Sequence, residues 1–461
     1  MAVWSCVNQS EIELSRLDAE YYRPEHIQLS KKISSLESIS IAKAGVQIDC
    51  SAFYPSIVPY YDFTGSGIPF LRVNEIQDGL ISVNDKTAFL SENVLLANKS
   101  TIARCVPGDV VIAKGGNSVG KVALLTDDFE EYSVCRDVLV LRTQQLETLN
   151  KYLLWIYLHS KIGQSLLLRT ASQTGQPHLT IEAIAKLLVP VFSDTQQQYF
   201  EDSYKAAMQA QRDSRLRYSH AQEFLEAELG LDKLTFQKPM GYVANFSDVE
   251  ASRRSDAEFF HIRYEPFLSA VRSYQRGWQP LKNLTKQTLP NFDSHKRSGD
   301  VAYIEIGDVI VSSGSYAANR VAAKDLPANA KIELSGGEIL ISQVRPTRGA
   351  IAITDDELPH PTVCSGAFYV CTANEVSHRE VIWLYLRCMK SVFEKFCGGT
   401  SYPTIDSRYI ARFPVPLFDA ELAKRIQQLV VQSKSALRES EQLIDQAKTR
   451  VEQLIEAAVQ P

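Results

Sequence analysis

The chain repeats itself once, at a period much longer than that of common repeat proteins. Five sequence blocks occur twice in the same order. The first copy contains RLDAEYYRPE from Arg16, IPFLRVNEIQDGLI from Ile68, VPGDVVIAKGGNSVGKVALLTDD from Val106, LWIYLHSKIGQ from Leu154 and LLVPVF ending at Phe192. The second contains RSDAEFFHIR from Arg254, VAYIEIGDVIVSSG from Val301, LSGGEILISQVRPTRGAIAITDD from Leu334, IWLYLRCMKSV from Ile382 and FPVPLF ending at Phe418. Because chance similarity does not preserve the order of five blocks, we expect two related domains.

Each copy has the residue pattern of a mixed α/β domain. Short apolar runs flanked by glycine, proline and aspartate, such as VVIAK and EILISQ, are typical of strands. Apolar residues then recur at helical spacing over Tyr152–Leu168 and over Glu380–Phe396. In a chain of 461 residues, this pattern predicts α/β domains at residues 1–192 and 237–418, with helical segments at 193–236 and 419–461.

The segment 419–461 has the residue spacing of a coiled coil. Apolar or small residues recur in alternating steps of four and three at Ile426, Val430, Ser433, Leu437, Ser440, Ile444, Ala447, Val451 and Leu454. The segment 193–236 is less regular, because Gln211 and Ser214 interrupt its apolar positions. A lone solvated helix is the alternative for each segment. A seam of this length needs a partner, so we expect the two segments to pair as an antiparallel coiled coil.

Composition excludes some classes of protein and leaves others open. The 49 Lys and Arg residues against 54 Asp and Glu residues give a net charge of −5, which rules out a uniformly basic nucleic-acid coat but permits a local basic patch. None of the eight cysteines has zinc-ligand spacing, and no apolar run reaches the length of a membrane span. Without the apolar stretch of a signal peptide at the N-terminus, we expect a cytoplasmic protein with reduced thiols that does not interact with membranes.

The common catalytic motifs are absent from the sequence. There is no G-x-x-x-x-G-K-[ST] phosphate loop, no G-x-S-x-G nucleophile elbow and no H-E-x-x-H zinc motif. The Asn/Asp-Pro-Pro-aromatic tetrapeptide with which amino-methyltransferases hold a base is also missing. GGNSVGK at Gly115–Lys121 is followed by Val122 where the phosphate loop needs Ser or Thr, and it lies between two predicted strands and not before a helix. We therefore expect no catalysis, cofactor or metal on this chain.

Polar side chains gather on the turn between two predicted strands in each copy. They are Lys114, Asn117, Ser118 and Lys121 in the first copy, and Gln343, Arg345, Thr347 and Arg348 in the second. Arg and Lys pair with phosphate or guanine, Asn and Gln pair with adenine, and glycine lets a backbone approach a ligand closely. The turns are therefore candidate DNA-contacting tips. The alternative is a polar turn with solvated charges.

A second polar loop follows the predicted helix of each copy. It reads RTASQTGQPHLT at Arg169–Thr180 and GGTSYPT at Gly398–Thr404. Small polar residues interleaved with Gln, His and Tyr suit hydrogen bonds to bases or phosphates, and the candidate residues are Gln173, Gln176, His178, Ser401 and Tyr402. The copies differ most in these loops while their strands agree. This difference predicts that two different DNA sequences are read.

Two further motifs recur and have alternative interpretations. The acidic pairs Asp127–Asp128 and Asp355–Asp356 suit either a metal or acid–base site or a turn after a strand. We favour the turn, because the adjoining chemistry is absent. The Asp-Ala-Glu motifs at Asp18–Glu20 and Asp256–Glu258 are followed by aromatic pairs. We interpret them as structural segments that pack onto the domain.

The ordered, doubled set of elements resembles the specificity subunit of type I restriction–modification enzymes. The resemblance spans nearly the whole chain and is carried by GDVVIAKGGNSVGKVAL with its partner GEILISQVRPTRGAIAI, and by HLTIEAIAKLLVPVF with its partner PTIDSRYIARFPVPLF. The irregular segment 193–236 departs from the pattern, as does Tyr-Pro in the second polar loop where the first has Gln-Pro-His.

The resemblance implies a function as well as a fold. Each α/β module would be a target recognition domain that reads half of a split site in double-stranded DNA. The helices would form a spacer that docks two methyltransferase subunits, and a restriction and translocation subunit would join them in a phage-defence system. S-adenosylmethionine, ATP and Mg would be bound by those partners. Two internal copies give one chain a pseudo-twofold symmetry that suits two identical partners.

Three other interpretations stay open at this point. The chain could be the recognition part of a fused restriction–methylation enzyme, against which the missing motifs count. It could be a similar subunit of another phage-defence system. It could also be a coiled-coil assembly scaffold without DNA binding, although such a scaffold would have no reason to carry two different polar tips.

Overall fold

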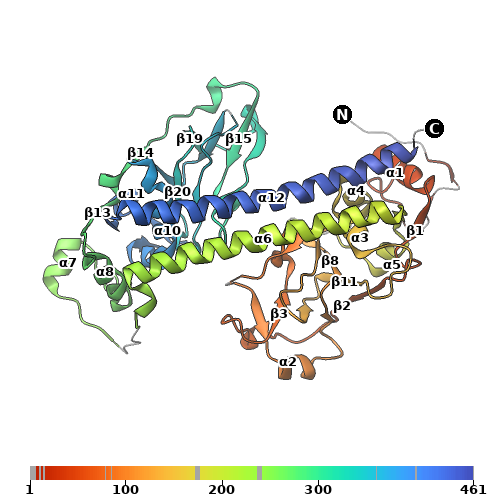
Figure 1. Ribbon diagram of the computed structural model, residues 1–461, viewed down its shortest axis with the longest axis horizontal. Coiled ribbons are helices and arrows are strands. Elements are labelled where there is room, and N and C mark those ends of the chain that lie inside the picture. The colour runs from red at the N-terminus through yellow and green to blue at the C-terminus, as the bar shows by residue number, and fades with distance from the viewer. Residues whose placement is uncertain are drawn as a thin grey trace. The chain divides into compact units, whose positions relative to one another are not determined.

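The computed structural model describes residues 7–9, 12–13, 16–77, 79–84, 86–171, 177–235, 241–359, 361–399 and 402–459. It contains two compact units. Unit 1 comprises Met1–Ala210 and Glu439–Pro461, and unit 2 comprises Gln211–Arg438. Both boundaries fall inside the long helices α6 (Asp194–Leu229) and α12 (Ala420–Val459), which Figure 1 labels. Each unit thus contains one copy of the repeat and one part of each long helix.

The two units repeat the same arrangement of strands. The first sheet of unit 1 has the order β2 (Gln47–Cys50), β11 (Val138–Arg142), β8 (Val110–Ala113), β9 (Val122–Leu124), β5 (Gly79–Ile81) and β4 (Ile76–Gln77). Its counterpart in unit 2 has the order β14 (Thr285–Thr288), β23 (Phe368–Ala373), β20 (Ile339–Ser342) and β21 (Ile351–Ile353). These four strands match β2, β11, β8 and β9 one by one, so the sequence repeat is also a repeat of topology.

A second sheet occurs in both units with matching strand order. In unit 1 it runs β6 (Ala88–Leu90), β3 (Ile68–Leu71), β10 (Tyr132–Val134) and β7 (Arg104–Cys105). In unit 2 it runs β18 (Asn319–Ala322), β15 (Asp300–Ile304), β22 (Thr362–Ser365) and β19 (Ala330–Leu334). In each, one central pair is parallel: β3 with β10, and β15 with β22. Both units are therefore mixed α/β, and the predicted fold class is confirmed.

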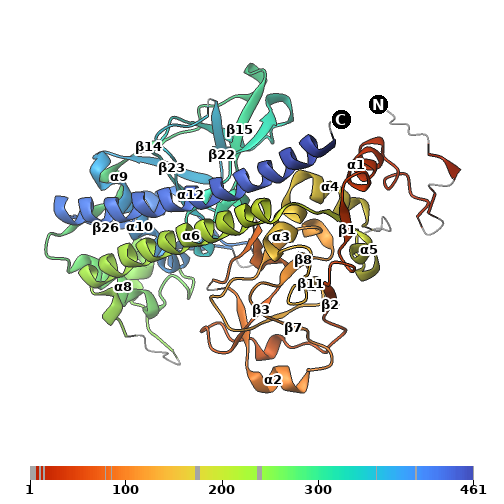
Figure 2. The ribbon, with the colours of Figure 1, turned by 45° about the vertical axis from the view of Figure 1, so that its right-hand side comes forward.

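The central strand β8 is apolar at every position because both of its faces are buried. Val110 and Ile112 of β8 pack in the core beneath the helices, whereas Val111 and Ala113 pack in the core that also contains residues of the second sheet. Side chains of a strand alternate between its two faces, so a strand between two layers needs a continuous apolar run. Figure 2 shows β8 and β11 beneath helix α3 (Lys151–His159) in unit 1.

The helix that precedes each polar loop differs from its prediction. Residues 152–168 form two helices, α3 and α4 (Lys161–Arg169), which meet at Ser160. Ser160 has extended backbone (φ −67°, ψ 161°), and its hydroxyl accepts a hydrogen bond from the backbone N–H of Gly163 at 3.1 Å. A Cβ atom at Gly163 would lie 1.8 Å from the carbonyl oxygen of Tyr157, so only glycine permits this close approach. In unit 2, helix α10 (Arg379–Cys388) likewise gives way to the 3-10 helix η12 (Lys390–Phe396).

The long helices pair within each unit. Phe200, Tyr204 and Ala207 of α6 share a core with Ile444, Ala447 and Val451 of α12 in unit 1. In unit 2, Ala221 and Leu225 share a core with Ile426 and Val430. The beginning of α6 thus packs in the same unit as the end of α12, so the helices run antiparallel (Figures 1 and 2). Of the predicted seam residues on α12, all but the half-buried Leu437 and Leu454 are buried, which confirms the predicted pairing.

The interruption of the first seam at Ser214 is matched by a polar residue on the facing helix. The hydroxyls of Ser214 and Ser433 lie 3.1 Å apart, and the Ser433 hydroxyl donates to the Ser214 carbonyl at 2.8 Å. Both serines are buried. Because every buried polar group needs a partner, two small hydroxyls facing each other allow the helices to stay paired here.

Candidate nucleic-acid interface

The predicted tips are turns of identical length in the two units. In unit 1 the turn joins β8 to β9 and contains the 3-10 helix η4 (Gly116–Ser118). In unit 2 the turn joins β20 to β21 and contains η10 (Pro346–Arg348). The position occupied by Gly116 in the first turn (φ 71°) is occupied by Arg345 in the second (φ 47°). A left-handed backbone is ordinary for glycine and costs about 1–2 kcal/mol for other residues. Arg345 is therefore held in a strained conformation, which residues at functional sites often adopt.

In unit 1 the polar loop lies directly against the turn. The backbone N–H of Leu179 donates to the carbonyl of Lys114 at 2.8 Å, and His178 forms an isolated β-bridge with Gly115. A Cβ atom at Gly115 would lie 2.4 Å from Nδ1 of His178. Glycine at this position thus allows the two segments to touch.

The same connection occurs in unit 2. The backbone N–H of Ile405 donates to the carbonyl of Gln343 at 2.9 Å, which is the counterpart of the Leu179 bond. Val344 forms an isolated β-bridge with Thr404, as Gly115 does with His178. In addition, the N–H of Arg345 donates to the carbonyl of Pro403 at 2.7 Å. Each unit therefore brings its two predicted loops together into one surface, and we call these the turn–loop surfaces of units 1 and 2.

The side chain of Arg345 is placed by an aromatic ring from the polar loop. Its guanidinium carbon lies 4.6 Å from the centroid of the Tyr402 ring. Tyr402 is 58% exposed and Arg345 is half-buried. A guanidinium stacked on a ring loses little side-chain entropy when it binds, and its planar donors match a guanine edge or a phosphate. Two of the predicted residues of unit 2, one from each polar segment, thus contact each other.

The remaining predicted residues divide into several groups. Lys121, His178 and Arg348 are exposed on the turn–loop surfaces, and Lys114, Ser118 and Thr347 are half-buried there. The side-chain amide of Gln343 donates to the Ser407 hydroxyl at 2.8 Å, so this group is engaged in holding the loop. The side chain of Asn117 and all of Gln173, Gln176 and Ser401 lie outside the described residues. The DNA-binding role of the whole set stays a prediction.

Two residues that sequence reasoning missed also touch the turns. Gln164 of α4 donates from its side-chain amide to the carbonyl of Gly120 at 2.8 Å. Lys390 of η12 lies against the other turn, with its Cδ atom 2.9 Å from the position that a Cβ atom of Gly349 would take. Both come from the segments after the tryptophan-bearing helices, far from the turns in sequence. They can be identified only from the structure, which brings them into contact with the turns.

The acidic pair of unit 2 is a structural anchor. Asp355 accepts from Lys434 of α12 at 3.0 Å and also pairs with Arg438, while Asp356 pairs with Arg379. The hydrogen bond from Arg379 lowers the pKa of Asp356, and burial lowers the pKa of Lys434 against the opposing effect of Asp355. Asp355 thus connects the module to α12 and Asp356 connects it to α10, which agrees with the structural interpretation. Within the described ranges, no group of His, Cys, Asp and Glu has the arrangement of a metal site.

The part of the chain that the structure describes contains no helix with the length and apolar character needed to cross a membrane. No known protein family and no curated protein matches the chain by sequence.

A comparison with solved structures did find matches. The chain is similar to the S subunit of a type I restriction–modification system from M. genitalium, with 12% identity, coverage of 92% of this chain and 96% of that chain, and a TM-score of 0.43. It is similar to the HsdS subunit from Thermoanaerobacter tengcongensis, with 12% identity, 93% and 94% coverage, and a TM-score of 0.27. A chain from a structure on complex assembly and conformational transition of the type I R-M system has 13% identity, 92% and 96% coverage, and a TM-score of 0.28. Because such identities leave most side chains different, the function of this chain has to be argued from its own residues.

Proposed function

We propose that the chain is a non-catalytic DNA-recognition subunit that reads a split site with its two turn–loop surfaces. The observation that carries this proposal is that the same backbone framework occurs twice and bears different side chains on its two turn–loop surfaces. Lys121 and His178 are exposed in unit 1, where unit 2 has Arg345, Arg348 and Tyr402. Matching frames with different polar tips are what two readers of different sequences need.

The charges of these residues suit DNA although the whole chain is acidic. Both surfaces carry cationic side chains on turns, from which Arg and Lys reach phosphates or base edges. Arg345 is already stacked and strained, and it therefore has less conformational freedom to lose on binding. A scaffold without a ligand would gain nothing from keeping a strained arginine on an exposed turn.

The proposed partners follow from the same assignment. As in the family that the sequence resembles, two methyltransferase subunits would bind the chain and carry S-adenosylmethionine. A restriction and translocation subunit would carry ATP and Mg. The paired helices α6 and α12 would then set the gap between the two half-sites. We expect no methyl transfer by the isolated chain, and transfer by the purified chain alone would contradict the assignment.

The test is a selection from a pool of randomised duplex DNA. The full-length chain is used alone and with a methyltransferase subunit from the same organism. We expect enrichment of two short motifs separated by a fixed, unread gap, with an affinity that falls as salt rises. The double variant Arg345→Ala/Arg348→Ala should relax one motif, and Lys121→Ala should affect only the other. Enrichment of no motif, or of one continuous motif, would refute the proposed function.

The spacing role has its own test. Four residues inserted into α6 at Arg215 add about 6 Å of helix, at about 1.5 Å per residue. The selected half-sites should keep their sequences, because the turn–loop surfaces are unchanged, and the gap between them should lengthen. An unchanged gap with full affinity would restrict the helices to assembly.

A further inference from the structure

The side chain of Arg254 is held in place by residues close to it in sequence. The guanidinium of Arg254 donates to both carboxylate oxygens of Asp256, at 2.7 and 2.9 Å. Asp256 also accepts from the backbone N–H of Phe259 at 3.0 Å. The carboxylate therefore fixes the direction of the guanidinium and the turn of the backbone at the same time. The side chain of Arg254 is only 14% exposed.

The same guanidinium connects this segment to the polar loop 142 residues further along the chain. It donates to the carbonyl of Phe396 at 3.1 Å and to the carbonyl of Cys397 at 2.7 Å. Cys397 begins strand β24 (Cys397–Gly398), which pairs with β25 (Thr404–Ile405) to form the base of the loop. Arg254, which is not part of the loop, thus binds the beginning of its first strand.

An aromatic ring and a second cation complete the arrangement in unit 2. The Arg254 guanidinium carbon lies 4.9 Å from the centroid of the Phe259 ring, and the Lys395 ammonium lies 4.6 Å from it. The Lys395 ammonium also donates to the carbonyl of Phe259. Both cations are partly buried beside the ring, where cation–π attraction is stronger than at exposed sites.

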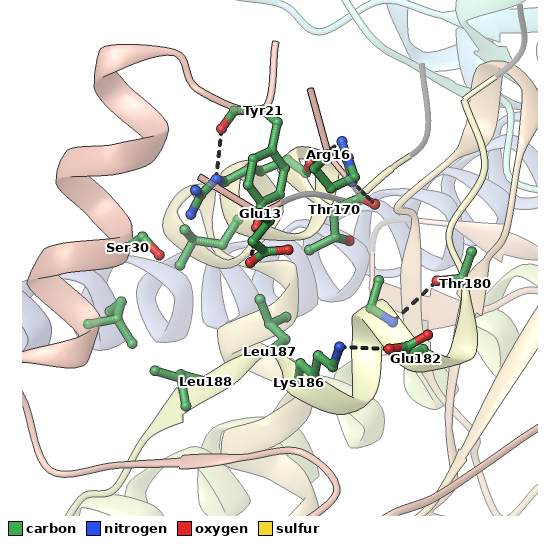
Figure 3. A pocket seen from close by; sticks show the side chains of 14 residues that line it. Glu13, Arg16, Tyr21, Ser30, Thr170, Thr180, Glu182, Lys186, Leu187 and Leu188 are labelled. Atoms are coloured by element: carbon green, nitrogen blue, oxygen red, sulfur yellow. Dashed lines mark hydrogen bonds and ion pairs between the residues drawn. The ribbon is translucent and has the colours of Figure 1, made fainter. Parts of the chain in front are cut away.

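Unit 1 contains the same arrangement, again with an arginine and an aspartate but with a different ring and a different second cation. The guanidinium of Arg16 donates to Asp18 at 2.9 Å and to the carbonyls of Arg169, Thr170 and Ala171 at 3.1, 2.8 and 2.9 Å. The Tyr21 ring lies between Arg16 and Arg169, at 4.4 and 4.1 Å from their guanidinium carbons. Arg169 donates to the carbonyl of Tyr21 at 2.8 Å (Figure 3). We call the set of Arg16, Asp18, Tyr21 and Arg169 the latch of unit 1, and the set of Arg254, Asp256, Phe259 and Lys395 the latch of unit 2.

The latch of unit 1 borders a cavity. Arg16, Tyr21, Arg169 and Thr170 line a cavity of about 540 Å³, with Glu182 and Lys186 on its opposite side (Figure 3). Arg16 holds the base of the polar loop here through its three hydrogen bonds to the carbonyls of Arg169, Thr170 and Ala171, which is why we assign it a specific role.

The contacts in unit 2 lead without interruption from the latch to the candidate DNA residues. Arg254 binds the carbonyls of Phe396 and Cys397, β24 pairs with β25, and β25 and the residues before it bind the turn. The last of these bonds are those from Ile405 to Gln343 and from Arg345 to Pro403. The strained backbone of Arg345 and the ring of Tyr402 thus depend on the position of the loop base.

We propose that Arg16 and Arg254 are positioning residues for DNA recognition, one for each half-site. Each latch fixes the base of one polar loop and thereby the geometry of one turn–loop surface. This inference rests on the proposed function where it concerns DNA. Where it concerns loop geometry, it can be tested on the free protein.

The first experiment is hydrogen exchange on the full-length chain without DNA, with Arg254→Ala, Arg16→Ala and the conservative variants Arg254→Lys and Arg16→Lys. In Arg254→Ala, the amides of Arg345 and Ile405 should exchange at least about tenfold faster, equivalent to about 1.4 kcal/mol, while that of Leu179 is unchanged. Arg16→Ala should give the converse. The lysine variants should restore part of the protection, because lysine can still donate to one carbonyl. Unchanged exchange within the variant's own unit would overturn the latch, whatever the DNA result.

The second experiment repeats the DNA selection with the same variants. In Arg254→Ala, the preference for the motif read by unit 2 over other sequences should fall about tenfold. The other motif and the non-specific affinity should be retained. A merely structural defect would lower both together, and that outcome overturns the positioning role. If Arg254→Ala does not fold, Phe259→Leu removes the ring and keeps an apolar side chain, and the same selective broadening is required of it. If the wild-type chain selects no split motif, the proposed function fails while hydrogen exchange still decides the latch.

Discussion

Replacing Arg345 by glycine should leave the stability of unit 2 nearly unchanged and lower its affinity for DNA. Arg345 has φ 47° where the first copy has Gly116. The substitution relieves about 1–2 kcal/mol of left-handed strain. It loses about 0.5–1 kcal/mol of cation–π attraction to Tyr402, and the freer unfolded chain costs about 0.4–1 kcal/mol more to fold. These contributions nearly cancel, so we expect the free energy of unfolding to change by less than about 1 kcal/mol.

DNA affinity should respond quite differently. A lost bidentate contact to guanine costs about 1–3 kcal/mol and relaxes one base position, whereas a lost phosphate contact weakens all sequences equally. The matched control is Gly116→Ala in unit 1. Apart from its chain neighbours, no atom of the described residues lies within 4 Å of the added Cβ, so the substitution introduces backbone strain, and stability should fall by about 1 kcal/mol.

Native-state hydrogen exchange at β20 and β21 measures the stability of unit 2 separately from that of unit 1, and competition binding measures affinity. The reasoning is refuted if Arg345→Gly lowers stability by more than about 2 kcal/mol, or if it keeps full affinity and sequence preference.

Three further predictions concern stability. Asp355→Asn removes the carboxylate that pairs with Lys434 at 3.0 Å and should lower the free energy of unfolding of unit 2 by about 1–2 kcal/mol, measured by hydrogen exchange. Ser433→Ala should cost about 1 kcal/mol and more than Ser214→Ala, because the Ser433 hydroxyl also donates to the Ser214 carbonyl, measured by urea unfolding. Burial raises the pKa of the Cys371 thiol from 9.0 to about 12; the unfolded thiol therefore ionises first, and stability should fall as pH rises from 9 toward 12, measured by urea unfolding at each pH.

Each of these has a result that would contradict it. An Asp355→Asn variant as stable as wild type would show that the pair with α12 contributes nothing. Equal losses for the two serine variants would mean that the hydroxyl–carbonyl bond is unimportant. For the thiol, Cys371→Ala is the control, and it should have a flatter alkaline decline than wild type. An identical decline would assign the pH dependence to other groups.

The sequence predicted much of the framework because the relevant signals are local. The duplicated blocks correspond to matching sheets with matching strand order. The seam of α12 was confirmed because a helix of that length repeats its buried positions at a fixed spacing. The prediction of a single helix over residues 152–168 was wrong. The break at Ser160 depends on a close contact between Gly163 and Tyr157, which the spacing of apolar residues does not reveal.

The candidate site could be predicted only in part. The two polar segments of each copy were identified as separate tips from their residue types, and the structure brings them together by single backbone bonds such as that from Leu179 to Lys114. The strain at Arg345 follows from its alignment with Gly116 once the backbone angles are known. The hydrogen bond from Gln343 to Ser407 could not be predicted. A glutamine on a polar turn looks the same in the sequence whether its amide binds DNA or another part of the chain.

By itself, the sequence determined that the chain contains two copies of one α/β framework, two long helices and polar tips that differ between the copies. Those properties are set by neighbouring residues and by regular spacing along the chain. Only the tertiary structure decided which loop meets which turn, how Ser214 is matched by Ser433, and that Arg254 binds the base of the second polar loop. Each of these joins residues far apart in sequence. Such contacts are formed by the path of the whole chain, and no local pattern of residue types specifies them.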